Sequence, residues 1–207
     1  MKGKKTFFIA VLLIAGGLLS LGYTLYHSVI ADTGPGSQEV SSSTLAAAAG
    51  QAPPANFPEM NHPAELSIPS LGIDAKVVDV GVTAKGAMAV PKSFQQVGWY
   101  KYGAMPGNSG SAVLAGHVDN GLSLAGVFKK LKNIGVGDAI SVTDDAGDVA
   151  TFEVTGTSSL DYKSSDTSAI FKKGGPAVLT LITCDGDWVQ SDKTYDARLI
   201  VTATRVK

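Results

Sequence analysis

The chain has 207 residues, of which 44% are hydrophobic and only 17% are charged, and its formal net charge is −1. This composition excludes a disordered polyelectrolyte, and it leaves no basic surface of domain size, so we expect no nucleic-acid partner. A single cysteine forms no intramolecular disulfide and builds no cysteine-based zinc site. The 24 glycines and 9 prolines favour a turn-rich, mainly β architecture.

The N-terminus carries an uncharged apolar stretch behind three lysines. Lys2, Lys4 and Lys5 precede residues 6–26, and these 21 residues can cross a hydrocarbon core about 30 Å thick as a helix. Because positive charges stay on the cytoplasmic side, residues 1–30 are predicted to be a signal anchor. The expected topology is a single pass, with the N-terminus in the cytoplasm and the remaining chain outside the cell membrane. A signal peptide cleaved after Ala31 is the alternative, and the length of the apolar run argues against it.

A linker and one folded domain are expected after this anchor. Residues 31–62 hold serine, alanine and proline runs without sustained apolar periodicity, which predicts a flexible linker. Residues 63–207 are long enough to bury one proper core. We expect this domain to be monomeric.

The folded domain shows mostly strand patterns. Alternating or continuous apolar runs predict strands at residues 65–68, 75–80, 112–116, 139–143, 149–157, 177–183 and 198–205. Residues 144–147 have the composition of a hairpin turn. Apolar residues at helical spacing predict a helix of about two turns over residues 124–131. Roughly eight short strands with one or two short helices indicate a small closed barrel or a sandwich.

Two residues with chemical potential follow apolar strands of this domain. Cys184, the only thiol, lies where the strand 178–182 opens into a glycine-containing turn, and His117 ends the strand 112–116. A thiol paired with an imidazole is the minimal set for covalent acyl transfer. A small buried cysteine and a structural strand-end histidine are the alternatives for the two residues taken singly.

Arg198 is the third candidate, 14 residues beyond Cys184 at the start of the last predicted strand. In an antiparallel hairpin joined by residues 185–194, Arg198 returns beside Cys184. A guanidinium in that place can bind the oxyanion of a tetrahedral intermediate. The alternative is a solvated strand arginine.

These segments resemble the three signature segments of sortases, the membrane-anchored cysteine transpeptidases of Gram-positive cell surfaces. They are the Ala-Gly-His exit at His117, the Thr-Leu-Ile-Thr-Cys segment ending at Cys184, and the Arg-Leu-Ile-Val strand starting at Arg198. Residues 68–74, 97–100, 106–110 and 116–119 fit as well, and they look most like class F or class E-like actinobacterial sortases. The resemblance covers residues 64–207.

The resemblance implies an eight-stranded β-barrel that cleaves a C-terminal Leu-Pro-x-Thr-Gly (LPxTG) type sorting signal between Thr and Gly. By this likeness Cys184 is the nucleophile that forms a thioacyl-enzyme, His117 protonates the departing glycine amine, and Arg198 stabilises the oxyanion or positions the threonine. The acyl group then passes to an amine acceptor, a peptidoglycan precursor or a pilin lysine.

The likeness also suggests where the peptide binds. Residues 161–175 fall in the family's variable loop that shapes the peptide groove, so Ser168 and Ile170, with Thr183 beside the cysteine, are the predicted substrate-binding residues. One sortase class binds calcium, but Asp144, Asp145 and Asp148 look like a solvated turn. We predict no metal and no cofactor.

Two other functions compete with this interpretation. L,D-transpeptidases also use Cys and His outside the cytoplasm, but their motif places the two close in sequence, whereas His117 and Cys184 are 67 residues apart. A membrane-tethered β-barrel binding module with an inert cysteine is the second rival. Alkylation by iodoacetamide discriminates, because an inert buried thiol resists it in the folded state.

Overall fold

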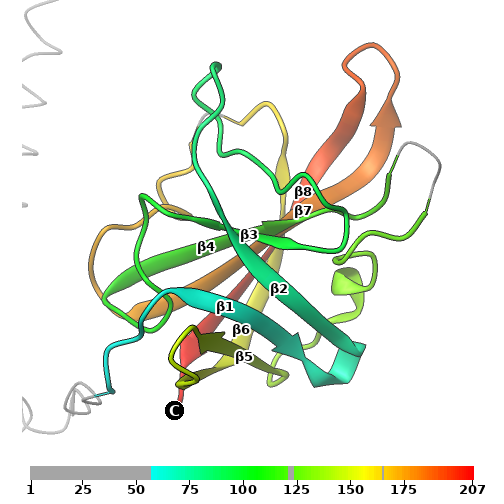
Figure 1. Cartoon of the computed structure of the whole chain (residues 1–207). Helices are drawn as coiled ribbons and strands as arrows, with labels where there is room; N and C mark the ends of the chain where they lie inside the picture. Colours follow the sequence, from blue (N-terminus) through cyan, green and yellow to red (C-terminus); the bar gives the residue numbers. More distant parts are fainter. Residues whose placement is uncertain (1–56, 121–123, 165) are drawn as a thin grey trace, which may run out of the picture. The chain divides into compact units, whose positions relative to one another are not determined.

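The computed structural model describes residues 57–120, 124–164 and 166–207, in which eight strands close into a barrel in the order β1-β2-β3-β4-β7-β8-β6-β5 (Figure 1). The strands are β1 (Pro63–Ile68), β2 (Ile73–Val80), β3 (Val97–Tyr100), β4 (Gly110–Gly116), β5 (Ala139–Asp144), β6 (Val149–Asp161), β7 (Ala177–Val189) and β8 (Thr194–Arg205). Two short 3-10 helices, η1 (Pro69–Leu71) and η2 (Leu131–Asn133), complete the described elements. The predicted mainly β, eight-stranded closed barrel is confirmed.

Two strands with long apolar runs lie side by side. Every residue of β4 is buried, and β4 pairs in parallel with β7, in a register that sets Ala115 opposite Ile182. A strand covered on both faces needs a continuous apolar run, which is what the sequence supplies there. Because parallel strands end at the same edge, the residues that follow β4 emerge next to the second half of β7.

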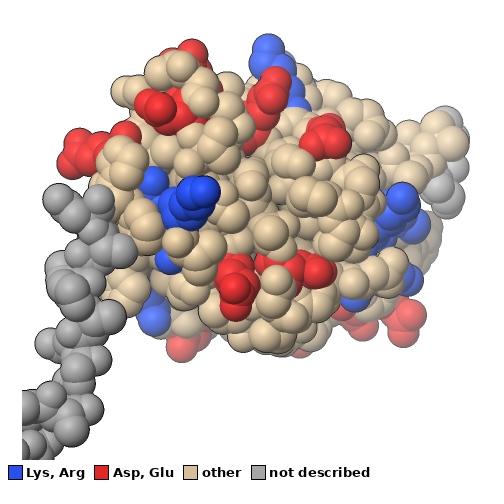
Figure 2. Space-filling view, turned by 90° about the horizontal axis from the view of Figure 1, so that it is seen from below, with Lys and Arg blue, Asp and Glu red and all other residues tan. Residues whose placement is uncertain are grey.

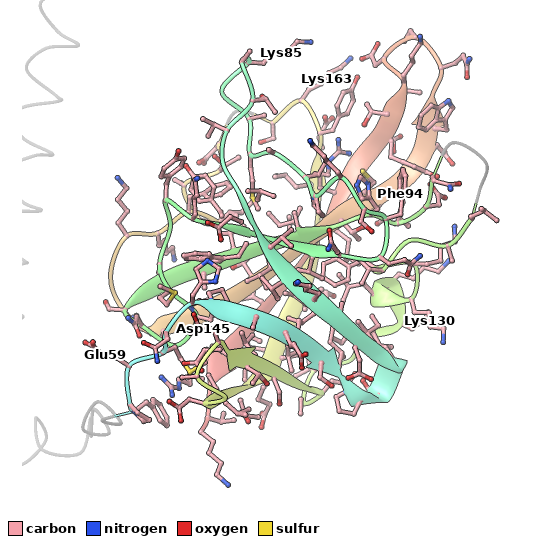
Figure 3. All side chains as sticks on the ribbon, viewed as in Figure 1. Glu59, Lys85, Phe94, Lys130, Asp145 and Lys163 are labelled. Carbon is pink, nitrogen blue, oxygen red and sulfur yellow. The ribbon has the colours of Figure 1, made fainter. Side chains whose placement is uncertain are left out.

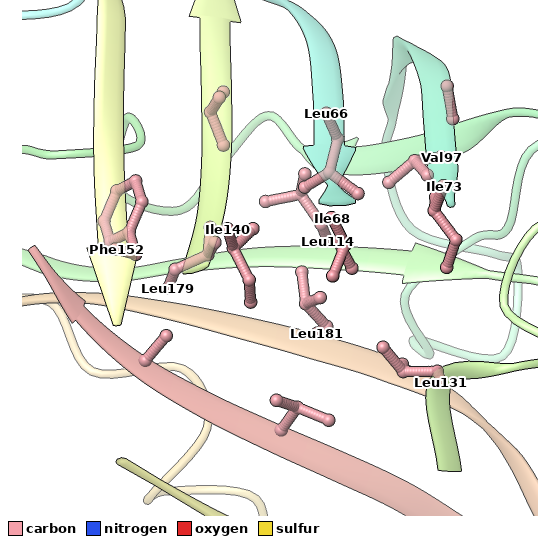
Figure 4. Close-up of a cluster of buried hydrophobic side chains, with 14 of the residues drawn as sticks. Leu66, Ile68, Ile73, Val97, Leu114, Leu131, Ile140, Phe152, Leu179 and Leu181 are labelled. Atoms are coloured by element: carbon pink, nitrogen blue, oxygen red, sulfur yellow. The ribbon is translucent and has the colours of Figure 1, made fainter. Parts of the chain in front are cut away.

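The barrel interior is filled by aliphatic side chains from almost every strand. Figure 4 shows Leu66 and Ile68 of β1, Leu114 of β4 and Leu181 of β7 converging there, and each has an exposed fraction of at most 1%. Inward-facing side chains alternate with outward-facing ones along β5, as the period of two requires. This packed interior is the rigid support of the site.

The helix predicted over residues 124–131 is wrong. Among its described residues the backbone N–H groups of Gly126, Val127 and Phe128 donate to the carbonyls of Val118, Phe94 and His117. These N–H groups are therefore not available for the i→i−4 hydrogen bonds of an α-helix. The segment forms turns, and only residues 131–133 are helical, as η2. The apolar spacing reflected burial instead, since Phe128 and Leu131 are fully buried while Leu124 is 62% exposed.

The folded part begins before Pro63, where the linker was predicted to end. Met60 is buried in the core, and the Phe57 ring lies 4.5 Å from the guanidinium carbon of Arg205. Arg205 also donates to the carbonyl of Pro58 over 3.0 Å. Residues 57–62 are therefore part of the barrel unit.

The predicted anchor and most of the linker lie outside the described residues. Among residues 57–120, 124–164 and 166–207, no helix is long and apolar enough to cross a membrane. On the face shown in Figure 2, basic and acidic side chains are interspersed among uncharged ones.

Asp144, predicted to belong to a solvated turn, is buried with an exposed fraction of 3%. Its carboxylate accepts hydrogen bonds from the backbone N–H groups of Asn61 at 2.8 Å and of Ala146 and Asp148 at 2.9 Å. Burial alone would raise the pKa of Asp144, but these backbone donors outweigh it and hold the pKa below its ordinary value. One carboxylate thus closes the β5–β6 turn and fastens the N-terminal segment.

Asp144 should therefore make stability depend on pH. A group whose pKa is lowered by folding stabilises the fold above its unfolded pKa, and this contribution is lost as pH falls through the folded pKa. Asp144→Ala should lower the melting temperature at neutral pH, and this deficit should shrink as the buffer is acidified. Asp145→Ala, which removes an exposed carboxylate from the same turn, is the control and should behave like the wild type. An equal deficit at all pH values would contradict the assignment.

Candidate active site

His117 directly follows β4, and Cys184 lies beside this end of β4 but within β7, which continues to Val189 instead of opening into a turn at the cysteine. The Thr183 hydroxyl donates to the carbonyl of Gly116 over 2.9 Å, which joins the residue before the cysteine to the residue before the histidine. Thr183 has an exposed fraction of 4% and lines neither of the cavities described below. The buried hydroxyl gives no support to its predicted role in substrate binding. Thr183 positions Cys184 and His117 from beneath.

Cys184 is half-buried and opens into a cavity of about 680 Å³ that we name the His117 cavity. It is lined by Phe94, His117, Val118, Asp119, Asn120, Cys184, Trp188, Gln190, Lys193, Thr194 and Tyr195. Figure 3 shows Phe94 on the side of the barrel from which the long β7–β8 hairpin projects. The thiol is thus within reach of a ligand and is not sealed in the core.

His117 is held in one orientation by its backbone surroundings. Its Nε2 lies 2.8 Å from the carbonyl oxygen of Pro91, so Nε2 carries the proton and donates. The ring packs on Phe94, with the two centroids 4.5 Å apart. In the neutral imidazole this tautomer leaves Nδ1 as the nitrogen that can take a proton.

Arg198 returns beside Cys184, as the hairpin argument predicts. The two residues are direct partners in the antiparallel pairing of β7 and β8. Nη1 donates to the carbonyls of Tyr195 and Ala197, and Nη2 donates to the Thr194 hydroxyl. A guanidinium has five N–H bonds, so these three contacts fix its plane and leave other donors for a ligand.

Arg198 lines a second cavity of about 560 Å³, which we name the Arg198 groove. Its walls come from the arm between β2 and β3, from strands β3, β4, β6, β7 and β8, and from the loop after β6. They include Met88, Tyr100, Ala115, Leu160, Tyr162, Thr167, Ile170, Phe171, Ile182 and Ile200. Figure 3 shows Lys85 at the outer tip of the arm. The lining is largely apolar, and its charged residues are Arg198 and Asp161.

Of the predicted groove residues, Ile170 lies in this wall and is buried. Ser168 does not line the groove. It is exposed, and its hydroxyl donates to Asp166 over 2.7 Å, so its position gives no support to its predicted role in substrate binding. Tyr162 also lines this groove, beside Arg198. Its ring lies 5.8 Å from the Arg198 guanidinium, and its hydroxyl donates to Asp192 near the tip of the β7–β8 hairpin.

The charges around the thiol oppose one another. Burial raises the pKa of Cys184 above its ordinary value, the positive charge of Arg198 lowers it, and the negative charge of Asp119 raises it again. The net direction is upward, so the resting group at neutral pH is a thiol. Attack on a carbonyl then requires a base to take the proton.

No group of three or more His, Cys, Asp or Glu residues that could hold a metal ion occurs within the part of the chain that the structure describes.

Comparison with known proteins supplies the family. Residues 66–206, more than half of the chain, match the family model of the Sortase domain. The chain belongs to the sortase family. Sortases are cysteine transpeptidases that act on cell-wall substrates of LPxTG type, and this chain is such an enzyme. A search of the curated proteins finds no significant match.

Solved sortases share the fold at low sequence identity. Sortase C-1 from Actinomyces oris (formerly Actinomyces naeslundii) is 25% identical with a TM-score of 0.55, and the match covers 70% of this chain and 73% of that one. A lid mutant of sortase A from Corynebacterium diphtheriae is 24% identical with a TM-score of 0.56, covering 74% of each chain. Sortase A from Listeria monocytogenes is 22% identical with a TM-score of 0.53, covering 70% of this chain and 86% of that one.

The electrostatics at Cys184 give a pH prediction. Arg198→Gln removes the positive charge that favours the thiolate, so the pKa of Cys184 should rise further. The midpoint of iodoacetamide alkylation against pH should move to higher pH, while the limiting rate at high pH stays similar. Lys132→Gln, which removes an exposed charge on η2, is the control. A midpoint that stays in place or falls would show that Arg198 does not act on the thiol.

Proposed function

We propose that Cys184, His117 and Arg198 carry out the transpeptidation, and that the Arg198 groove receives the sorting signal. The observation that carries this proposal is the pairing of Cys184 with Arg198 across β7 and β8, with His117 following the neighbouring strand. Cys184 opens into the His117 cavity, whereas Arg198 lines the groove. Because Cys184 and Arg198 are direct partners across the two strands, a peptide that extends from the groove past Arg198 toward the His117 cavity can present one carbonyl to the sulfur and the guanidinium.

The chemistry follows from the protonation states. Nδ1 of His117 takes the thiol proton while the Cys184 sulfur attacks the threonine carbonyl, and a tetrahedral oxyanion forms. Arg198 donates to that oxyanion with the N–H groups that its backbone contacts leave over. The C–N bond then breaks, the His117 imidazolium protonates the departing glycine amine, and a thioester remains on Cys184.

The walls of the groove fit the start of an LPxTG-type signal. Apolar side chains such as Ile170, Leu160 and Met88 suit a leucine and a proline, which need no hydrogen bonds from the wall. The acceptor of the second half-reaction is an amine, from a peptidoglycan precursor or a pilin lysine. The motifs at residues 68–74 and 116–119 support a class F or class E-like assignment.

The roles of the three residues can be tested with a fluorogenic LPxTG-type peptide. Cys184→Ala should abolish cleavage, and Arg198→Ala should lower kcat/KM by about 10²–10³ with partial recovery in Arg198→Lys. Circular dichroism should be unchanged in each variant. Ser168→Ala is the matched control, because Ser168 lies in the loop after β6 but outside the groove, and it should cleave as the wild type does. Cleavage by Cys184→Ala above a few per cent would remove the thiol from the mechanism.

We also propose that residues 6–26 anchor the enzyme in the cell membrane, with a cytoplasmic N-terminus and a monomeric domain outside. Three lysines followed by 21 uncharged residues support this topology. The full chain should fractionate with membranes, and protease added to cells stripped of their wall should digest the domain. Protein released into the medium and trimmed after Ala31 would instead support a cleaved signal peptide.

A further inference from the structure

Asp119 brings a carboxylate into the same cavity as the candidate nucleophile, and the acyl-transfer chemistry proposed above does not use it. The His117 cavity and the Arg198 groove share no lining residue. Once a thioester has formed, the acyl peptide still occupies the groove. The second substrate must then approach the thioester carbonyl from the His117 cavity, where Asp119 lies.

The carboxylate is held in a fixed position. Its Oδ2 accepts a hydrogen bond from the Tyr195 hydroxyl at 2.8 Å and from the Lys129 ammonium at 3.1 Å. The bond to Asp119, with burial, raises the pKa of Tyr195 to about 12, so Tyr195 remains a neutral donor. Within the described residues both bonds fall on Oδ2, which leaves Oδ1 to a ligand. The Asp119 side chain has an exposed fraction of 12%.

The neighbouring walls of the cavity are aromatic. Trp188 and Tyr195 pack edge to face with their centroids 5.4 Å apart, and Trp188 is 52% exposed. Phe94 lines the same cavity against His117. Aromatic faces beside a carboxylate favour an ammonium group over a neutral or anionic one. Lys193, the cation of the lining, is exposed near the tip of the hairpin.

We propose that Asp119 is a specificity-determining residue that binds the ammonium group of the amine acceptor in the His117 cavity. This inference rests on the proposed function, in which Cys184 carries the thioester. It assigns the acceptor a chemical class, a primary amine, and a charge, because this amine binds in its protonated form.

The transfer step then balances without a further reactant. The ammonium bound at Asp119 gives one proton to Nδ1 of neutral His117, and its nitrogen forms a bond to the thioester carbon. The C–S bond breaks, and a second proton passes from that nitrogen to the Cys184 sulfur, which regenerates the thiol. The products are the amide and a His117 imidazolium, which returns its proton to solvent.

The test compares a charged acceptor with a neutral one on the full chain. An LPxTG-type peptide is the acyl donor, glycinamide is the cationic acceptor, and hydroxylamine, largely unprotonated at neutral pH, is the neutral acceptor. Asp119→Asn should raise the KM for glycinamide about tenfold or more. The KM for hydroxylamine should stay within about twofold of the wild type. Because Asp119→Asn also removes a charge that acts on the Cys184 thiol, hydrolysis and both transfer rates are compared as ratios, and the ratio of transfer to glycinamide over transfer to hydroxylamine should fall.

Two further variants separate recognition from architecture. Tyr195→Phe removes the hydroxyl that holds Asp119 but keeps the carboxylate and the ring, so it should leave the glycinamide KM within about threefold. Asp187→Asn removes an exposed charge from the same hairpin outside the cavity and should change nothing.

The outcomes distinguish the inference about Asp119 from the proposed function on which it rests. If Asp119→Asn still cleaves the peptide and keeps a wild-type KM for glycinamide, this inference alone is overturned. If Tyr195→Phe raises the KM for glycinamide as much as Asp119→Asn does, or if the KM for hydroxylamine rises equally, Asp119 only holds the hairpin to the loop after β4, and the inference is overturned. If Cys184→Ala still cleaves the peptide, the proposed function and this inference are overturned together.

Discussion

The parallel pairing of β4 with β7 is the constraint on which the site depends. It brings together two chain segments that are 67 residues apart, and the Thr183 hydroxyl bonded to the Gly116 carbonyl fixes their ends to one another. The paired residues are mostly apolar, and the two buried hydroxyls among them, Ser111 and Thr180, hydrogen-bond to each other over 2.9 Å. A change that shifted this register would move the thiol relative to the imidazole, whatever else stayed in place.

The second constraint is the β7–β8 hairpin, which forms part of both cavities. Cys184 and Arg198 pair within it, and a register shift between Asp185 and Trp188 follows directly after the cysteine. Such an irregularity bends and twists a hairpin locally, so the outer part can turn away from the barrel. In Figure 1 this hairpin projects beyond the barrel wall. It thereby places Arg198 in the wall of the groove and Trp188 and Tyr195 in the wall of the His117 cavity.

Charged groups act on the pKa of Cys184 in opposite directions, and the resting group is a neutral thiol. Arg198 acts on the thiol from the neighbouring strand, and Asp119 opposes it from the loop after β4. Burial adds to the effect of Asp119, so the nucleophile is kept protonated until a base accepts its proton. In the proposed function the two substrates meet different surroundings: the peptide lies in a largely apolar groove that contains Arg198 and Asp161, and the acceptor enters an aromatic cavity that contains Asp119 and Lys193.

The sequence by itself determined the strand content and the meeting of Arg198 with Cys184, because strand periodicity and a short hairpin are local properties. The strand pattern left a barrel or a sandwich open, and the resemblance to sortases implied the barrel. It could not determine the path of residues 124–131, whose backbone donors are taken by Phe94, His117 and Val118 from other segments. Nor could it place Ser168 outside the groove, bury Asp144, or turn Thr183 toward Gly116. Those outcomes depend on contacts between distant parts of the chain, and the closure of the barrel decides which donors and acceptors meet.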